Sequence, residues 1–109
     1  MATRRIPKKV KEIVRGYRSR LVRRGRVPID RAILFGSHAH RLARSWSDID
    51  VCLISSRFKD PLEATRFLLH QRSEEEVRAG LEPIGFTPAD FREGSSLIDE
   101  IKRTGVDVI

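Results

Sequence analysis

The sequence of 109 residues contains a single cysteine, Cys52, and few aromatic side chains. One cysteine cannot form a disulfide within the chain, which favours a protein of the reducing cytoplasm. No apolar run approaches the ~20 residues that a membrane-spanning helix requires, and the N-terminus lacks the apolar block of a secretory signal. We therefore expect a cytoplasmic protein with no membrane segment. We also expect one domain over residues 1–109, because this length leaves no room for a second core.

Acidic residues are scarce in the first quarter of the chain, where basic residues are concentrated. Residues 1–26 hold eleven Lys or Arg residues and one acid, Glu12, whereas the whole sequence has a formal net charge of +7. This asymmetry indicates a polyanionic partner, either a nucleic acid or an acidic protein. The alternative is a solvated face of an ordinary amphipathic helix.

Helical periodicity is clearest in this basic segment. Apolar residues recur at three- and four-residue spacing from Val10 to Val22, and most residues between them are Lys or Arg. The pattern predicts an amphipathic helix over about residues 8–24 with one inward-facing stripe. Gly25 and Pro28 are expected to end it.

Two short strands are predicted next. Residues 31–35 form an apolar run that leads directly into Gly36, and residues 48–55 form a second run rich in β-branched and apolar side chains. Residues 38–47 between them lack a strand pattern. We expect a short helical turn and a loop there.

The following segment predicts a helix and a third strand. Asp60 and Pro61 are typical of an N-cap and a first helical residue. Leu81–Phe86 is apolar enough for a strand, but Pro83 restricts it to an edge position or a bulge because proline cannot donate a ladder hydrogen bond.

One last helix is predicted from Thr87-Pro88 to Gly105, with Leu97 among its inward-facing residues. Residues 106–109 are expected to add a final short strand. The element order α-β-β-α-β-α predicts a mixed α/β fold in which helices pack against a small sheet.

Two carboxylates, Asp48 and Asp50, stand one residue apart at the head of the second predicted strand. Because successive strand residues point to opposite faces, both project from the same face, about 6.6 Å apart along the strand. Mg²⁺ prefers one or two carboxylates together with phosphate oxygens and water, so this pair is a candidate metal site. The alternative is a strand capped by two solvated acids. Cys52 shares the same face and is expected to lie buried beneath the pair.

A Gly-Ser pair ends the preceding strand. Gly36 lets the backbone turn sharply and approach a ligand, and Ser37 adds a hydroxyl donor. Combined with Asp48 and Asp50 on the adjacent strand, this turn indicates a nucleoside triphosphate held over metal ions.

The spacing of these residues resembles a known signature. Gly36-Ser37, ten further residues and Asp48-Ile49-Asp50 resemble the Gly-Ser-x10-Asp-x-Asp pattern of the minimal nucleotidyltransferases, which belong to the polymerase-beta-type superfamily. The resemblance covers nearly the whole chain, since family members also begin with a helix and end with a strand, a third carboxylate and a helix. It implies the nucleotidyltransferase fold and a nucleotidyltransferase activity with ATP as the nucleotide donor.

The resemblance implies catalytic and metal-binding roles for three acids. Asp48 and Asp50 would hold Mg²⁺, or Mn²⁺ in its place. A third carboxylate would complete the metal site and act as general base on the acceptor hydroxyl. Element order favours Glu82 for this position, while Asp107 in the last strand is the alternative.

The resemblance also places the triphosphate on the Gly-Ser turn and the residues that follow it. Gly36 and Ser37 would bind the phosphates, with Arg41 and Arg44 as further contacts. His38 in the same loop is an additional candidate. Arg41 departs from the family, which usually has glycine there, and a positive φ at this position would cost a non-glycine residue roughly 1 kcal/mol.

Minimal members of this family are typically antitoxins whose partner is a HEPN-type ribonuclease toxin, and some transfer AMP from ATP to a tyrosine of that partner. The resemblance implies the same role for this chain, with assembly into a homo- or hetero-oligomer. Two alternatives stay open. One is a transferase acting on a small molecule or an RNA end, with RNA bound by the basic N-terminal helix. The other is a binding module that neutralises its partner stoichiometrically.

Overall fold

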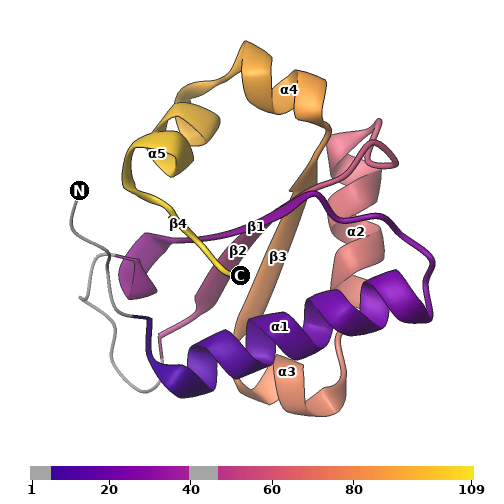
Figure 1. Cartoon of the computed structure of the whole chain (residues 1–109), viewed down its shortest axis with the longest axis vertical. Helices are drawn as coiled ribbons and strands as arrows, with labels where there is room; N and C mark the ends of the chain where they lie inside the picture. The colour runs from indigo at the N-terminus through magenta and orange to yellow at the C-terminus, as the bar shows by residue number, and fades with distance from the viewer. Residues whose placement is uncertain (1–5, 40–46) are drawn as a thin grey trace.

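The computed structural model of the chain describes residues 6–39 and 47–109, which form a mixed sheet with helices on both faces (Figure 1). Its strands are β1 (Arg31–Phe35), β2 (Ile49–Ile54), β3 (Leu81–Phe86) and β4 (Val106–Asp107). Its helices are α1 (Lys8–Arg23), α2 (Pro61–His70), α3 (Glu74–Arg78), α4 (Pro88–Glu93) and α5 (Ser96–Thr104). A 3₁₀ turn, η1 (Gly36–His38), follows β1 directly. The predicted mixed α/β fold is confirmed.

The sheet has the strand order β3-β2-β1-β4. β1 pairs antiparallel with both β2 and β4, whereas β2 pairs in parallel with β3. A parallel pair requires a crossover connection, which α2 and α3 provide here. Because β2 is central, the residues at its head have a neighbouring strand on each side.

Alternation along β2 gives the sheet two different faces. Val51 points into the larger core beneath α1 and α2, where Tyr17 and Leu68 are fully buried. Cys52 points to the opposite face and into a smaller core, to which α4 contributes Phe91 and α5 contributes two isoleucines. Each face is therefore sealed by its own pair of helices.

Pro83 lies in edge strand β3, as its sequence context predicts. The outward-facing backbone of this strand is covered by side chains. Arg72 donates from Nη1 to the Leu81 carbonyl at 3.0 Å, and the Gly85 N–H donates to the Thr65 hydroxyl at 3.4 Å. Pro83 itself has no N–H to satisfy. These features protect an edge that would otherwise pair with another strand.

The prediction of one continuous helix from Thr87 to Gly105 is wrong, because the structure has two helices there. It is divided into α4 and α5 at Gly94, whose φ of +86° lies in the left-handed region that only glycine adopts freely. Ser95 then caps α5 by accepting a hydrogen bond from the Ile98 N–H at 3.2 Å. Leu97, predicted to face inward, is 44% exposed.

The charged residues after α2 form a helix of their own, which the predicted element order lacks. Ser73 accepts a hydrogen bond from the Glu76 N–H, and the Glu76 carboxylate accepts one from the Ser73 N–H. This capping box starts α3 even though the segment is only five residues long.

Helix α1 closely matches its predicted range of residues 8–24. Gly25 follows its end, where a Cβ would lie 2.8 Å from the Leu21 carbonyl oxygen. Val22, assigned to the inward stripe from sequence, is instead 44% exposed. Across the described part of the chain, no helix combines the length and hydrophobicity that crossing a membrane would require.

Candidate active site

Asp50 lies near the start of β2, between the neighbouring strands β1 and β3. Its register partners are Phe35 of β1 and Glu82 of β3. Adjacent strands are about 4.8 Å apart, so the Asp50 and Glu82 side chains leave the same face of the sheet side by side. The structure therefore brings together two of the three acids that the sequence nominates.

Asp48 precedes β2 and is exposed to solvent. It lies against Gly80, which has a φ of +83° and whose O atom accepts a hydrogen bond from the Ile49 N–H at 2.8 Å. A Cβ at Gly80 would stand 3.2 Å from the Asp48 Oδ1 atom. The glycine before β3 thus leaves room for this carboxylate, a contact that sequence reasoning missed because it joins residues far apart in the chain.

Gly36 lies directly against the Asp50 carboxylate. Its φ of +73° belongs to the left-handed region, and a Cβ there would overlap the Asp50 Oδ2 atom. Any other residue at position 36 would therefore displace the acid as well as strain the turn. The Gly-Ser pair and the Asp-x-Asp pair are two halves of one site, with the partly exposed Ser37 next in η1.

Electrostatic repulsion is concentrated at Asp50. Partial burial raises the pKa of this carboxyl, and the neighbouring charges of Asp48 and Glu82 raise it further, while His38 opposes them. Negative groups that repel one another are held together by the fold rather than by mutual attraction. A cation would relieve this repulsion, which is the electrostatic condition for metal binding.

His38 has a larger role than the sequence indicates. Its Nε2 atom lies 3.3 Å from the Ser47 carbonyl oxygen, across the loop that joins η1 to β2. Its Nδ1 atom is buried and has no hydrogen-bond partner within the part of the chain that the structure describes. The sequence signal for His38 was its position directly after Ser37.

The two candidates for the third acid lie in different places. Asp107 on β4 pairs in register with Ile33, so β1 separates it from β2, and Arg31 binds both of its carboxylate oxygens at 3.1 Å. Glu82 neighbours Asp50 and has a 4.0 Å ion pair with Arg72, leaving 47% of its side chain exposed. The geometry places Glu82, and not Asp107, beside the Asp-x-Asp pair.

The donor set of the site fits a hard divalent cation. Within residues 6–39 and 47–109, no three His, Cys, Asp or Glu side chains already surround a common point as a metal cage would. Mg²⁺, however, usually takes only one or two protein carboxylates and completes its shell with phosphate oxygens and water. Asp48 and Asp50 meet that requirement, with Glu82 adjacent to Asp50 on the next strand.

Two of the predicted phosphate contacts, Arg41 and Arg44, lie outside the described residues. Cys52, predicted to be buried beneath the acids, is fully buried two residues beyond Asp50 on β2. Burial raises the pKa of its thiol to about 12, so it is an inert part of the core.

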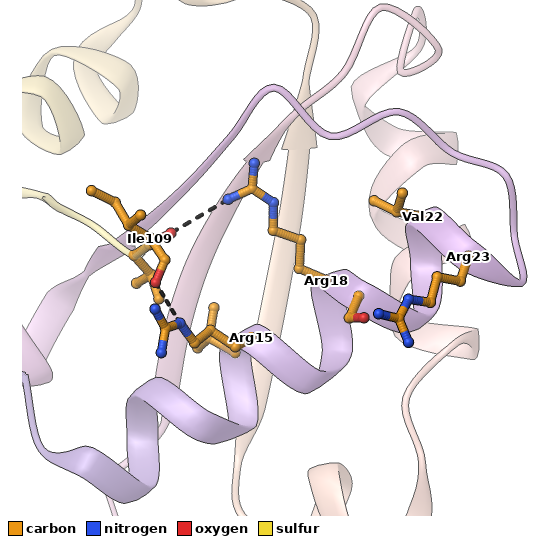
Figure 2. A pocket seen from close by; sticks show the side chains of 8 residues that line it. Arg15, Arg18, Val22, Arg23 and Ile109 are labelled. Atoms are coloured by element: carbon orange, nitrogen blue, oxygen red, sulfur yellow. Dashed lines mark hydrogen bonds between the residues drawn. The ribbon is translucent and has the colours of Figure 1, made fainter.

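A separate cavity of about 230 Å³ lies beside α1 (Figure 2). Arg15, Arg18 and Arg23 line it, together with apolar residues that include Val22. Arg15 donates to the Ile109 carbonyl and Arg18 to the Val108 carbonyl, the latter at 3.4 Å. The three guanidinium groups concentrate positive charge on this flank of the helix.

A glycine turn and a pair of acids thus lie against each other at one end of the mixed sheet. Residues 7–108 match the family model described as "Nucleotidyltransferase domain". The chain belongs to this nucleotidyltransferase domain family, and nucleotidyl transfer is the general chemistry that membership supports. A search of curated proteins found no match.

Proposed function

We propose that the chain is a magnesium-dependent nucleotidyltransferase that transfers AMP from ATP to a hydroxyl group of a partner protein. The partner would be a HEPN-type ribonuclease toxin, and the modification would make this chain its antitoxin. The observation that carries the proposal is the contact between Gly36 and the Asp50 carboxylate, with Glu82 paired to Asp50 on the next strand. This arrangement joins a turn that can accept phosphates to acids that can accept a cation.

The residues divide the chemistry between them. Asp48 and Asp50 would hold Mg²⁺, which supplies charge neutralisation for the triphosphate. The acceptor oxygen would form a bond to the α-phosphorus as the bond to the bridging oxygen breaks, so that pyrophosphate leaves. Glu82 would take the proton of the acceptor hydroxyl. Gly36 and Ser37 would orient the β- and γ-phosphates from the turn.

The exposure of the acids supports a large acceptor. Asp48 is exposed, and 47% of the Glu82 side chain is accessible to solvent. A hydroxyl on a protein surface could therefore reach the acids without first entering a deep pocket. The helices that seal this face of the sheet pack farther along β2, around Cys52 and Ile54.

The experiment is a labelling reaction with Mg²⁺, ATP labelled at the α-phosphate, and the product of the neighbouring gene. Transfer to that protein, abolished by Asp48→Asn and kept by Asp107→Asn, is the expected result. Asp107 is a matched control because it is an acid on the same sheet but is engaged by Arg31. If Asp48→Asn still neutralises the toxin as well as the wild type does, the chain acts as a binding module and the catalytic proposal fails.

A second candidate acceptor is an RNA end, and the positive flank of α1 favours it. Arg15, Arg18 and Arg23 line one side of this helix, with Arg15 and Arg18 reaching backbone oxygens of the last two residues (Figure 2). Binding through such a flank would weaken steeply as salt rises. Labelled RNA in place of labelled protein, lost on replacing Arg15 and Arg23 by Gln, would select this acceptor.

A further inference from the structure

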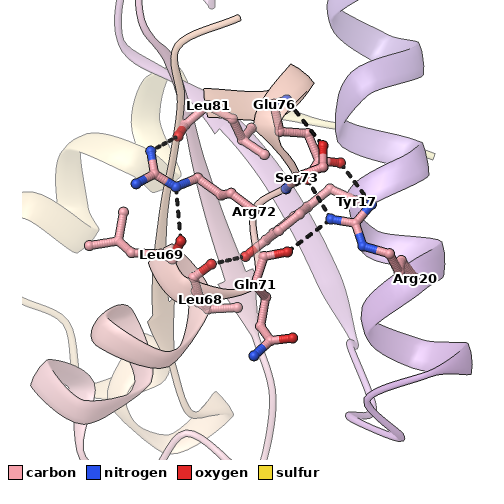
Figure 3. Close-up of polar contacts among 9 residues, drawn as sticks. All are labelled: Tyr17, Arg20, Leu68, Leu69, Gln71, Arg72, Ser73, Glu76 and Leu81. Carbon is pink, nitrogen blue, oxygen red and sulfur yellow. Dashed lines mark hydrogen bonds and ion pairs between the residues drawn. The ribbon is translucent and has the colours of Figure 1, made fainter. Parts of the chain in front are cut away.

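Arg72 lies in the turn between α2 and α3 and contacts both α2 and β3 (Figure 3). Its Nε atom donates to the Leu69 carbonyl at 3.0 Å, and its Nη1 atom donates to the Leu81 carbonyl at 3.0 Å. The same Nη1 atom lies 4.0 Å from the Glu82 Oε1 atom. One guanidinium thus joins the end of α2, the first residue of β3 and the third acid of the proposed site.

The fork of Arg72 is held in one orientation. Only 19% of its side chain is exposed, and its two carbonyl partners are fixed in a helix and a strand. A planar guanidinium with two anchored N–H groups cannot rotate as a lysine ammonium can. Glu82, by contrast, is half exposed and has no other ion pair in the described structure. The fixed Arg72 guanidinium therefore determines the position of the Glu82 carboxylate.

The turn that carries Arg72 is itself tied to α1. Tyr17 donates from its hydroxyl to the Leu68 carbonyl, and Arg20 donates to the Gln71 carbonyl at 2.9 Å (Figure 3). Arg20 also binds both oxygens of Glu76 in α3. Carbonyls at the end of α2 thus accept hydrogen bonds from side chains of α1 and from Arg72. This network holds the base of Arg72 in place.

We propose that Arg72 is a positioning residue for the reaction: it holds the Glu82 carboxylate at the edge of the metal site, beside Asp50. The inference rests on the proposed function for the role of Glu82, but it concerns a residue outside the Gly-Ser and Asp-x-Asp motifs. Three acids that repel one another need a fixed counter-charge on their outer side if they are to stay within reach of one cation. Arg72 supplies that charge from the edge of the sheet.

The test compares Arg72→Met with Arg20→Met, which removes an arginine of the same network that does not contact Glu82. Mn²⁺ binding to the purified protein is measured by electron paramagnetic resonance, and AMP transfer and thermal unfolding are measured in parallel. Both variants are expected to lower the melting temperature. Arg72→Met should also weaken Mn²⁺ binding and slow transfer by about 10-fold or more, as loss of a residue that orients a metal ligand does. Arg20→Met should leave Mn²⁺ binding within about twofold of wild type.

Two further variants distinguish the positioning role of Arg72 from the effect of its charge and from a general loss of stability. Arg72→Lys keeps the charge but not the anchored fork, and it should behave like Arg72→Met; full recovery would overturn positioning. In a Glu82→Gln background, Arg72→Met should have no additional effect on Mn²⁺ binding. Additive losses, equal effects of Arg72→Met and Arg20→Met, or tighter Mn²⁺ binding by Arg72→Met would each refute the inference. If Arg72→Met does not fold, Arg72→Lys and its Glu82→Gln double variant carry the same comparison.

These measurements also distinguish the inference from the proposed function. If the wild type binds Mn²⁺ but labels no acceptor, the proposed function fails, whereas the Mn²⁺ comparison still decides the role of Arg72. If the wild type transfers AMP and Arg72→Met matches Arg20→Met in every readout, the inference alone fails.

Discussion

Asp50 and Glu76 are both acids at partly or fully buried positions, yet their surroundings move their pKa values in opposite directions. Burial raises the pKa of Asp50, and Asp48 and Glu82 add to the effect. Burial alone would also raise the pKa of Glu76, but hydrogen bonds from Arg20 and from the Ser73 backbone outweigh it and lower the pKa. The negative charge of Glu76 is stabilised by hydrogen bonds, whereas that of Asp50 is destabilised by burial and by neighbouring acids.

The difference shows how the fold separates stability from function. Glu76 joins α1 to α3 through the Arg20 fork and stabilises the packing of both helices. Asp50 is held among other acids by strand pairing, and among the described residues the repulsion from Asp48 and Glu82 outweighs the opposing effect of His38. Local features that oppose stability are typical of functional sites. Substitutions at the two positions should therefore have separable consequences.

The largest separation is expected between Asp50→Asn and Glu76→Gln. Asp50→Asn should reduce the transfer rate by on the order of 1,000-fold, because electrostatic stabilisation is lost at the reacting phosphate. Without metal, its stability should equal or exceed that of wild type, because the repulsion is removed. Glu76→Gln should lower the free energy of unfolding by about 2 kcal/mol, since a charged hydrogen-bonded group is lost. Urea unfolding in EDTA and a transfer assay measure the two effects.

Equal loss of activity in both folded variants would contradict this separation. So would marked destabilisation of the metal-free protein by Asp50→Asn, because it would mean that Asp50 is a structural acid like Glu76.

The next comparison sets Glu82 against Asp107. Glu82→Gln should slow transfer by on the order of 100-fold, the contribution of a general base. Asp107→Asn breaks only a half-exposed ion pair with Arg31, so its rate should match wild type and its stability should fall by less than about 1 kcal/mol. Single-turnover rates at saturating ATP provide the measurement. The reverse ranking would assign the third acid to β4.

A third comparison uses two glycines that each lie against a carboxylate. Gly36 contacts Asp50, and Gly94 has a φ of +86° with its Cβ position 2.8 Å from the Asp99 Oδ1 atom. Alanine at either position should cost about 1–2 kcal/mol of stability through backbone strain. Only Gly36→Ala should also slow transfer, by about 10- to 100-fold, because it displaces a catalytic carboxylate. Similar rates for both variants would show that the Asp50 position is not critical.

The smallest expected effect is the pH dependence of the Glu76 contribution. Because folding lowers the pKa of this group from its usual value of 4.5, its stabilisation is present above about pH 4.5. It is then lost as the pH falls through the lowered pKa of the folded state. The difference in unfolding free energy between wild type and Glu76→Gln should therefore shrink between pH 5 and pH 3. The exposed neighbour variant Glu75→Gln serves as the control, and a difference independent of pH would contradict the prediction.

Local signals in the sequence predicted the elements well where a single segment determines them. The strand at 31–35, the Asp60 cap and the edge position of Pro83 depend on neighbours in the chain, and all three are confirmed. The break at Gly94 was missed because the apolar period continues across it. A single glycine is too weak a signal to outweigh that period.

The sequence nominates residues for the candidate site but does not indicate their contacts. Parity along one strand places Asp48 and Asp50 on one face, yet only strand pairing brings Glu82 beside Asp50. The roles of Gly80 and Arg72 depend on the parallel register of β2 and β3. Register between strands so distant in sequence is set by tertiary packing, and no local pattern encodes it.

Gly36 also limits which substitutions this protein can tolerate. Every other amino acid has a Cβ, so each substitution there strains the left-handed turn and collides with Asp50 in a single step. At Gly16, in the middle of α1, a Cβ would meet no atom within 4 Å among the described residues beyond its own helix backbone and chain neighbours, so alanine should be accepted there. In a saturation screen for activity, position 36 should tolerate nothing while position 16 tolerates most replacements, although both are glycine. Functional variants of this chain should therefore keep glycine at position 36 and differ at other positions.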